Sequence, residues 1–305
     1  MHQLSRSSQV RAAPAPLLAT APAQGKRFCR QLARLAVRSL YQELTLYPKP
    51  GLVSLVDNGS HADMNAATFM RSLFALRHYF YLIARAGMGG APFAQLQQLG
   101  VQAEARMLAA TGGINTHRGA IFALGMLCAA GAYCRGQHIG LSAAAMRAAL
   151  LIRWGDALAR HTLPDAGQHS HGLQVASRHA VGGAREEGAL GFPSVFEVAL
   201  PRLEATLAQG RSEHDARIDA LFALMAQLSD TNVYHRGGAA LAQWVRQRSA
   251  DFLAAGGTAH PHWQATAQRC HREFVQHRLS PGGAADLLAA ACLVRQACLL
   301  DETAP

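Results

Sequence analysis

The feature that most constrains the fold of this sequence is a helix-favouring Ala/Leu background, interrupted by four short glycine-rich blocks. Alanine, leucine, arginine and glutamine are abundant among the 305 residues, β-branched residues are sparse, and no alternating Val/Ile/Thr run predicts a strand. Half of the residues are hydrophobic, so the chain can bury a sizeable core. We therefore predict an all-α fold, a single compact multi-helix array with short connections.

The spacing of apolar residues and the positions of Gly and Pro predict where the helices lie. The expected helices cover residues 28–47, 65–86, 93–110, 120–134, 142–159, 174–180, 192–208, 214–228, 238–253, 260–278 and 281–300. Residues 1–26 resemble a signal peptide only superficially, because three prolines interrupt the short apolar stretch, so we expect a mobile tail. Residues 27–300 then form one helical domain that carries the site, and 301–305 a short tail.

The four glycine-rich blocks lie at residues 48–51, 112–119, 182–185 and 230–238. Glycine weakens a helix interior by about 1 kcal/mol relative to alanine, so such blocks indicate places where the backbone approaches something closely. Each block also carries one cation, and guanidinium and ammonium groups suit phosphate. These cations are Lys49, Arg118, Arg185 and Arg236. We therefore predict that glycine-rich loops at helix entrances form a nucleotide site.

Two of these blocks resemble each other, since 115–119 and 232–237 both carry Asn, His, Arg and Gly before an apolar helix. Coincidence explains the resemblance as well as a duplicated function does. If the resemblance has a functional cause, it predicts two equivalent helix N-termini that each hold a phosphate-bearing group.

Carboxylates and histidines beside the turns are the candidates for chemistry. Mg²⁺ bound with a triphosphate needs only one or two protein carboxylates, and simple N-capping is the alternative role for Asp63 and Asp230. The carboxylates near turns are Glu43, Asp63, Glu104, Glu187, Asp230 and Asp286. A histidine titrating near neutral pH suits general acid–base catalysis. His169, His171 and His179 lack the spacing of a helical zinc site, so zinc is disfavoured.

Charge and cysteine content limit the other classes of function. The net charge of +10 comes from singly scattered basic residues, which favours small anionic ligands over a nucleic-acid surface. The six cysteines include no C-x-x-C pair and are predicted to be reduced thiols of a cytoplasmic protein. Outside the first residues no uninterrupted apolar stretch of about 18 residues occurs, so we expect no membrane span.

Taken together, the motifs resemble those of the triphosphoribosyl-dephospho-CoA synthase family over about residues 30–300. In chain order they are Pro-Lys-Pro-Gly-Leu-Val (48–53), Gly-Ser-His-Ala-Asp-Met (59–64), Thr-Gly-Gly-Ile-Asn-Thr-His-Arg-Gly (111–119), Ser-His-Gly (170–172), Gly-Gly-Ala-Arg-Glu-Glu (182–187), Gly-Phe-Pro (191–193), Asp-Thr-Asn (230–232) with His-Arg-Gly-Gly (235–238), and Leu-Ser-Pro-Gly-Gly-Ala-Ala-Asp (279–286). Arg118 stands where many relatives have lysine.

The resemblance implies an all-helical pentosyltransferase that uses ATP. The ribose 2′-hydroxyl of 3′-dephospho-CoA would attack C1′ of the ATP ribose, releasing adenine and leaving the triphosphate on the product. Two nucleotides must then be bound while a glycosidic bond breaks through an oxocarbenium-like state. The product would pass to a phosphoribosyl-dephospho-CoA transferase and an acyl carrier protein, of malonate decarboxylase rather than citrate lyase.

On this basis the site residues divide into three groups. We expect catalysis from His61, Asp63, His117, Asp230 and His235. We expect phosphate or nucleotide contacts from Lys49, Gly51, Gly113, Asn115, Arg118, Gly183, Arg185, Asn232, Arg236, Gly237 and Gly283. Mg²⁺ would be held by Asp63, Asp230 and Glu187. Two alternatives stay open, a Mg²⁺-dependent helical nucleotide hydrolase and a basic helical nucleic-acid-binding protein, and the products formed from ATP would distinguish the hydrolase from the transferase.

Overall fold

A computed structural model describes residues 21–162 and 183–302 of the protein. Within these ranges every regular element is helical, which confirms the predicted all-α class. The elements are α1 (Ala21–Leu44), α2 (Ala66–Met88), α3 (Phe93–Thr111), α4 (Arg118–Gly136), α5 (Ala143–His161), α7 (Ala184–Ala189), η1 (Ser194–Ala199), α8 (Leu200–Ala208), α9 (Glu213–Gln227), α10 (Thr231–Ala254), η2 (Gly257–Ala259), α11 (Trp263–Gln276) and α12 (Gly282–Glu302).

Most predicted helices are present, and the differences have local causes. The first helix begins at Ala21, inside the stretch that we expected to be a tail. The helix expected at 192–208 is divided into a π-helical turn, η1, and α8, which carries a proline in its first turn. The short α7 was not predicted, and the helix expected at 174–180 lies outside the described residues.

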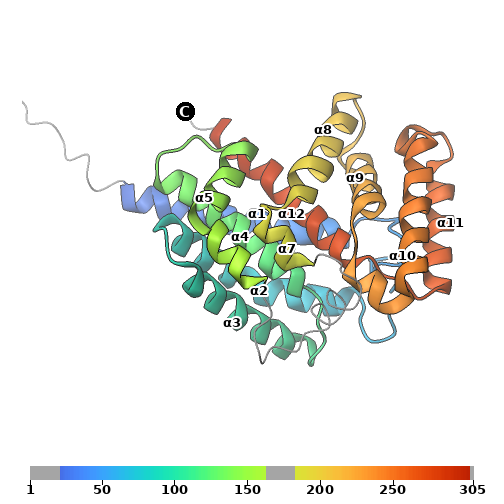
Figure 1. The fold of residues 1–305 in the computed structure, drawn as a ribbon, viewed down its shortest axis with the longest axis horizontal. Coiled ribbons are helices and arrows are strands. Elements are labelled where there is room, and N and C mark those ends of the chain that lie inside the picture. The colour runs from blue at the N-terminus through green and yellow to red at the C-terminus, as the bar shows by residue number, and fades with distance from the viewer. Residues whose placement is uncertain (1–20, 163–182, 303–305) are drawn as a thin grey trace, which may run out of the picture.

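Helices α4 and α12 form the centre of the array, and Figure 1 shows α3 and α5 toward one end of its long axis and α10 and α11 toward the other. The apolar helix α4 packs against α1, α2, α5 and α12. By length and hydropathy α4 and α12 could each cross a membrane, but 72% and 56% of these segments are buried inside the protein. They are therefore explained as core helices.

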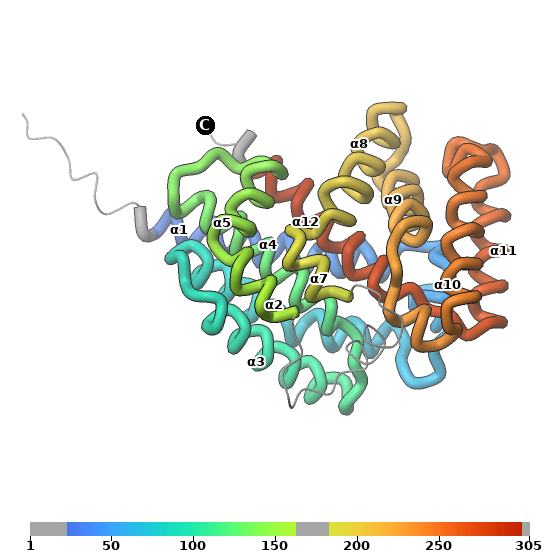
Figure 2. Tube along the Cα trace, viewed as in Figure 1, coloured from blue at the N-terminus to red at the C-terminus, as the bar shows by residue number. Residues whose placement is uncertain are grey.

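The starts of α4, α10 and α12 lie close together, next to the loop that follows α1. The loop after α1, light blue in Figure 2, reaches the start of α10, where Arg236 Nη1 donates a hydrogen bond to the Ser60 carbonyl oxygen (3.2 Å). Asp230 links α10 to α12, because its carboxylate accepts hydrogen bonds from the N–H groups of Asn232 (2.9 Å) and Ala284 (3.0 Å). This junction positions the candidate site.

Candidate active site

A cavity of about 760 Å³ opens between the starts of α4, α10 and α12, the loop after α1, and α7. Most of the predicted site residues line it. These are Lys49, His61, Asn115, His117, Arg118, Gly183, Arg185, Glu187, Asp230, Asn232, His235, Arg236 and Gly283. The predicted residues that do not line it are Gly51, Asp63, Gly113 and Gly237. The structure therefore brings most of the predicted residues together around one cavity, and their roles in function stay predictions.

The three glycines outside the cavity have structural roles in close packing or in a turn. Gly51 has φ +68°, and a Cβ there would lie 2.1 Å from the carbonyl oxygen of Leu279. Gly113, with φ +88°, belongs to the turn after α3. Gly237 packs against the side chains of Leu241 and Leu279. At Gly51 the close approach that we attributed to phosphate is thus made by the protein backbone.

Three arginines lie at the open side of the cavity. The side chain of Arg118 is 44% exposed and pairs with Glu104, with Nε 2.6 Å from Oε1. Arg236 is exposed and donates to the carbonyl oxygens of Ser60 and Arg278. Arg185 donates from Nη1 to the His161 carbonyl oxygen (3.2 Å). The side chains of Arg118 and Arg236 are exposed, so their guanidinium groups can also contact a bound ligand.

Lys49 differs from the arginines because it is buried, with 1% of its surface exposed. Its Nζ lies 2.5 Å from Glu43 Oε1 and 2.8 Å from the Glu43 carbonyl oxygen. Burial lowers the pKa of Lys49, and the neighbouring Glu43 carboxylate opposes that shift. Lys49 is thus one half of a buried ion pair in the cavity wall, and the phosphate contact that we predicted for it stays a prediction.

Asp230 and Glu187 use both carboxylate oxygens within the fold. Asp230 caps α10 and also binds the start of α12, as described above. Glu187 accepts from the Ser194 hydroxyl (2.6 Å) and from the Ser194 N–H (3.3 Å). Burial raises the pKa of each carboxyl group, and these hydrogen bonds partly offset the shift. The alternative role that we had considered for Asp230, N-capping, is the one the structure supports.

His117 is the most deeply buried of the predicted catalytic histidines, with 2% of its surface exposed. Its Nδ1 lies 2.6 Å from the Ser72 hydroxyl, and its ring packs edge-on against Phe69. Burial, reinforced by the Lys49 charge, lowers the pKa of His117 to about 3. Within the described part of the chain, its Nε2 and the neighbouring Thr116 hydroxyl have no hydrogen-bond partner. Both residues line the cavity, and buried polar atoms are usually hydrogen-bonded, so a ligand or water in the cavity can satisfy them.

His61 also lines the cavity and is held by side chains from two other segments. Its Nε2 is 2.9 Å from the Ser280 hydroxyl, and Arg236 Nη2 is 3.3 Å from its Nδ1. Burial lowers the pKa of His61, and the Arg236 charge acts in the same direction. Asp63, at 3.6 Å from Nδ1, is 61% exposed and lies outside the cavity. His235 lines the cavity as an exposed residue of α10.

The two similar Asn/His/Arg/Gly blocks are not equivalent in the structure. Residues 115–117 precede α4, and the Asn115 side chain accepts a hydrogen bond from the Arg118 N–H (3.1 Å). Residues 232–237 instead lie within the first turns of α10, which is kinked at Gly238 (φ +70°). The blocks reach the same cavity from different positions along their helices, so the prediction of two equivalent N-termini is wrong.

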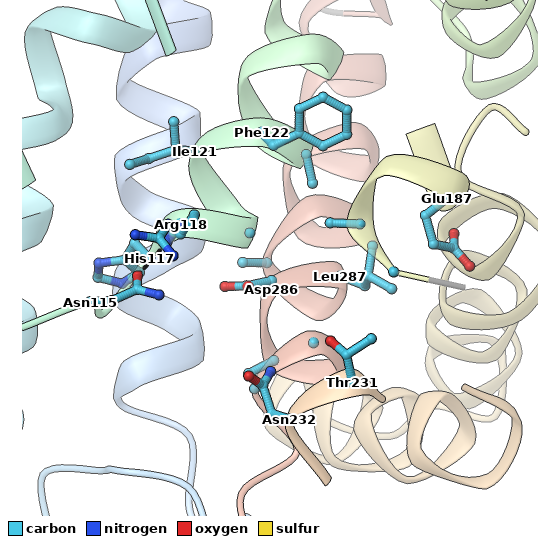
Figure 3. A pocket seen from close by; sticks show the side chains of 18 of the residues that line it. Asn115, His117, Arg118, Ile121, Phe122, Glu187, Thr231, Asn232, Asp286 and Leu287 are labelled. Atoms are coloured by element: carbon cyan, nitrogen blue, oxygen red, sulfur yellow. Dashed lines mark hydrogen bonds between the residues drawn. The ribbon is translucent and has the colours of Figure 1, made fainter. Parts of the chain in front are cut away.

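The structure also places Asp286 in the cavity lining. From the sequence we named this residue among the carboxylates near turns but did not assign it to the site. Figure 3 shows Asp286 on α12 between the start of α4 and Asn232 of α10. A Cβ on Gly119 would lie 2.2 Å from Asp286 Oδ2, so the carboxyl group rests directly against the α4 backbone. Burial raises the pKa of Asp286 well above its usual value, and the nearby Glu43 and Asp230 charges add to the shift. Its position one turn into a Gly-Gly helix start was the available sequence signal.

The predicted Mg²⁺ ligands do not form a metal site among themselves. Within residues 21–162 and 183–302 no group of three His, Cys, Asp or Glu side chains is arranged to hold a metal ion. Asp63 lies outside the cavity, and the oxygens of Asp230 and Glu187 are already hydrogen-bonded. The histidines considered for zinc, His169, His171 and His179, lie outside the described residues. Within the described residues none of the six cysteines forms a disulfide.

The fold and the cavity define an all-helical protein with a cationic rim and buried carboxylates, an arrangement suited to an anionic nucleotide. Residues 29–303 match the family described as ATP:dephospho-CoA triphosphoribosyl transferase. The chain belongs to this family and is therefore a transferase.

Curated relatives agree with this assignment. A 2-(5''-triphosphoribosyl)-3'-dephosphocoenzyme-A synthase of Klebsiella pneumoniae is 43% identical over 85% of this chain and 91% of its own length. Proteins named as probable synthases of the same kind, from Acinetobacter calcoaceticus and Pseudomonas putida, are 40% and 43% identical over 85% and 86% of this chain, and over 88% and 92% of their own lengths. No solved structure shows a significant match.

Proposed function

We propose that this cavity binds ATP and 3′-dephospho-CoA together and transfers the triphosphoribosyl group of ATP to the ribose 2′-hydroxyl of dephospho-CoA. The bond between C1′ and the adenine N9 breaks, and a new bond forms between C1′ and the attacking oxygen. Adenine leaves with one proton gained, and the hydroxyl group loses one, so the reaction is balanced without a further reactant.

The observation that carries this proposal is the separation of charge within the cavity. Arg118, Arg185 and Arg236 line the cavity, and Arg118 and Arg236 are exposed, whereas Glu43 and Asp230 are buried, each with less than a tenth of its surface exposed. Guanidinium groups bind phosphate oxygens bidentately, and the starts of α4, α10 and α12 add the positive ends of three helix dipoles. The triphosphate would therefore lie at the rim.

The inner end of the cavity suits the ribose and the base. Cleavage of a glycosidic bond develops positive charge on the sugar ring, and nearby carboxylates stabilise such a charge. The unpartnered Nε2 of His117 and hydroxyl of Thr116 lie beside the start of α4 and offer hydrogen bonds to a bound nucleotide. A site built for hydrolysis at phosphorus would instead be expected to place its polar groups around the phosphates.

In this proposal Mg²⁺ binds together with the phosphates of ATP. Asp230 and Glu187 are hydrogen-bonded within the fold and Asp63 lies outside the cavity, so we assign the metal no protein ligand. Mg²⁺ usually keeps several waters and binds through substrate phosphates, so it would neutralise part of the triphosphate charge near the arginine rim.

The proposal also includes the reactions that consume the product. We propose a cytoplasmic enzyme whose product is consumed by a phosphoribosyl-dephospho-CoA transferase and then by an acyl carrier protein. We favour the carrier protein of malonate decarboxylase over that of citrate lyase on general sequence similarity alone, because the same product serves both. Nothing in the cavity calls for a nucleic acid or a membrane as a partner.

Product analysis tests the reaction directly. Purified protein is incubated with ATP, Mg²⁺ and 3′-dephospho-CoA, with each nucleotide omitted in turn, and the products are identified by mass spectrometry. We expect free adenine and a triphosphoribosyl adduct of dephospho-CoA, formed only when both nucleotides are present. Unchanged dephospho-CoA together with ADP, AMP or phosphate would instead identify a nucleotide hydrolase.

A further inference from the structure

The carboxyl group of Asp286 is the feature of the cavity that the assignments above leave without a role. It projects from the first turn of α12 against the backbone of α4, where the Ala120 N–H donates toward it and Gly119 leaves room for it. The carboxyl groups of Glu43 on α1 and Asp230 at the start of α10 are close enough to act on it electrostatically. Three separate elements therefore place this one carboxyl group at the meeting point of the cavity walls.

The other acidic groups of the inner cavity already have partners within the fold. Asp230 and Glu187 accept hydrogen bonds at both oxygens, and Glu43 is paired with the buried Lys49. Asp286 is half-buried and lines the cavity, and the Ala120 N–H donates a hydrogen bond to it. Its carboxyl group is thus in a position to contact a ligand in the cavity.

The surroundings of Asp286 determine its protonation state. Partial burial in the cavity wall, together with the nearby Glu43 and Asp230 charges, disfavours ionisation of Asp286, so the protonated form is favoured. A neutral carboxyl group can donate a hydrogen bond, which an ionised one cannot. His117 is the wrong candidate for this task, because burial lowers its pKa to about 3 and its ring is neutral near pH 7.

We propose that Asp286 is the general acid that protonates adenine as it leaves, an inference that rests on the function proposed for this cavity. As the bond between C1′ and N9 breaks, its electron pair moves onto the purine, and the Asp286 proton is transferred to a purine nitrogen. The carboxylate left behind faces the positively charged ribose. The attacking hydroxyl releases its proton to water, and Asp286 regains a proton from solvent before the next turnover.

The test compares two leaving groups in the Asp286→Asn variant. General acid catalysis contributes roughly 100- to 10,000-fold, so we expect kcat with ATP and dephospho-CoA to fall at least about 100-fold. 7-Methyladenosine 5′-triphosphate carries a cationic purine that needs no proton to leave. With this analogue we expect the variant to retain kcat within about 10-fold of the unsubstituted protein.

Asp219→Asn is the matched control, because Asp219 is a buried carboxylate of α9 outside the cavity, bound to Arg202 and Thr206. We expect its kcat per folded molecule to be unchanged with both triphosphates. An equal loss by Asp286→Asn on ATP and on the methylated analogue would overturn the proposal, as would an unchanged rate on ATP. If the unsubstituted protein forms no adduct, the function proposed for the cavity fails instead.

A second measurement does not depend on the folding of a variant. In the unsubstituted protein, kcat with ATP should decrease at alkaline pH as Asp286 loses its proton, whereas kcat with the methylated analogue should not. Identical pH profiles for the two triphosphates would contradict a general acid at this position.

Discussion

At the scale of single residues, Lys49 and His117 lie close enough for the charge of one to act on the other. Lys49 is held by Glu43, and its charge joins burial in disfavouring a proton on His117. Lys49 was expected to bind phosphate, and His117 was expected to take part in catalysis as an acid or base. Because both are buried, they instead form part of a desolvated cavity wall. There the stable forms are a neutral imidazole and an ammonium group paired with a carboxylate.

The low pKa of His117 predicts how stability depends on pH. The pKa is about 3 in the folded protein, against an ordinary value of 6.5. Below about pH 6.5 the unfolded chain therefore binds a proton that the folded chain does not, and the free energy of unfolding falls as the pH falls. Between pH 7 and pH 5 this residue should account for a loss of about 2 kcal/mol, at about 1.4 kcal/mol per pH unit below its unfolded pKa.

The measurement is urea unfolding of the unsubstituted protein and of His117→Gln at both pH values. The raised pKa values of Asp230 and Asp286 act in the opposite direction, but both carboxyl groups are present in the two proteins. The unsubstituted protein should lose about 2 kcal/mol more than the variant between the two pH values. Equal losses would show that His117 becomes protonated in the folded state.

At the scale of elements, the contact between α4 and α12 sets the position of the proposed acid. Gly119 lies in the first turn of α4, and Asp286 Oδ2 occupies the space where a side chain would begin. The pairing is not local, because the two residues are separated by most of the chain. A methyl group at residue 119 must displace the carboxyl group, since the α4 backbone itself has little freedom to move.

Gly119→Ala should therefore lower activity without lowering stability. Alanine favours the helix by up to about 1 kcal/mol relative to glycine, so the melting temperature should be maintained or rise. We expect kcat to fall at least about 10-fold because the Asp286 carboxyl group moves from its position. Thermal unfolding and adenine release are the two measurements.

Gly155→Ala on α5 is the control, because a Cβ there meets Leu151 only at 3.9 Å and the residue lies outside the cavity. Its activity should match that of the unsubstituted protein. Full activity in Gly119→Ala would show that the contact between α4 and Asp286 does not position the carboxyl group for catalysis.

At the scale of the whole molecule, the cavity is lined by segments from both ends of the array. Residues between Leu40 and Ala289 contribute to it, and helices α1, α4, α10 and α12 meet there. A ligand that fills the cavity contacts all of these segments only when the chain is folded. Its binding free energy is therefore added to the free energy of unfolding.

ATP alone and dephospho-CoA alone should each raise the melting temperature. A ligand at about 100 times its Kd adds about 2.7 kcal/mol, which corresponds to several degrees for a domain of this size. Arbitrary duplex DNA at 0.15 M salt should produce no comparable shift, because the basic residues are scattered along the chain. Stabilisation by DNA but not by either nucleotide would favour the nucleic-acid-binding alternative. Differential scanning fluorimetry provides the measurement.

The sequence by itself determined the helical class, most helix positions and the segments that form the cavity. Apolar periodicity and the positions of Gly and Pro act over neighbouring residues, so they can be read along the chain. Even the predicted helix start at Gly238 coincides with a real kink in α10. Resemblance to the family found the reaction class because its motifs are ordered along the whole chain.

Only the tertiary structure decided which polar side chains of these motifs are available to a ligand. It paired Lys49 with Glu43, used Asp230 as a cap for two helices, and placed Gly51 against Leu279. It also brought Asp286 against Gly119, a juxtaposition that no local pattern indicates. Hydrogen-bond partners and desolvation depend on contacts between residues far apart in the chain, and these contacts determine charge state and accessibility.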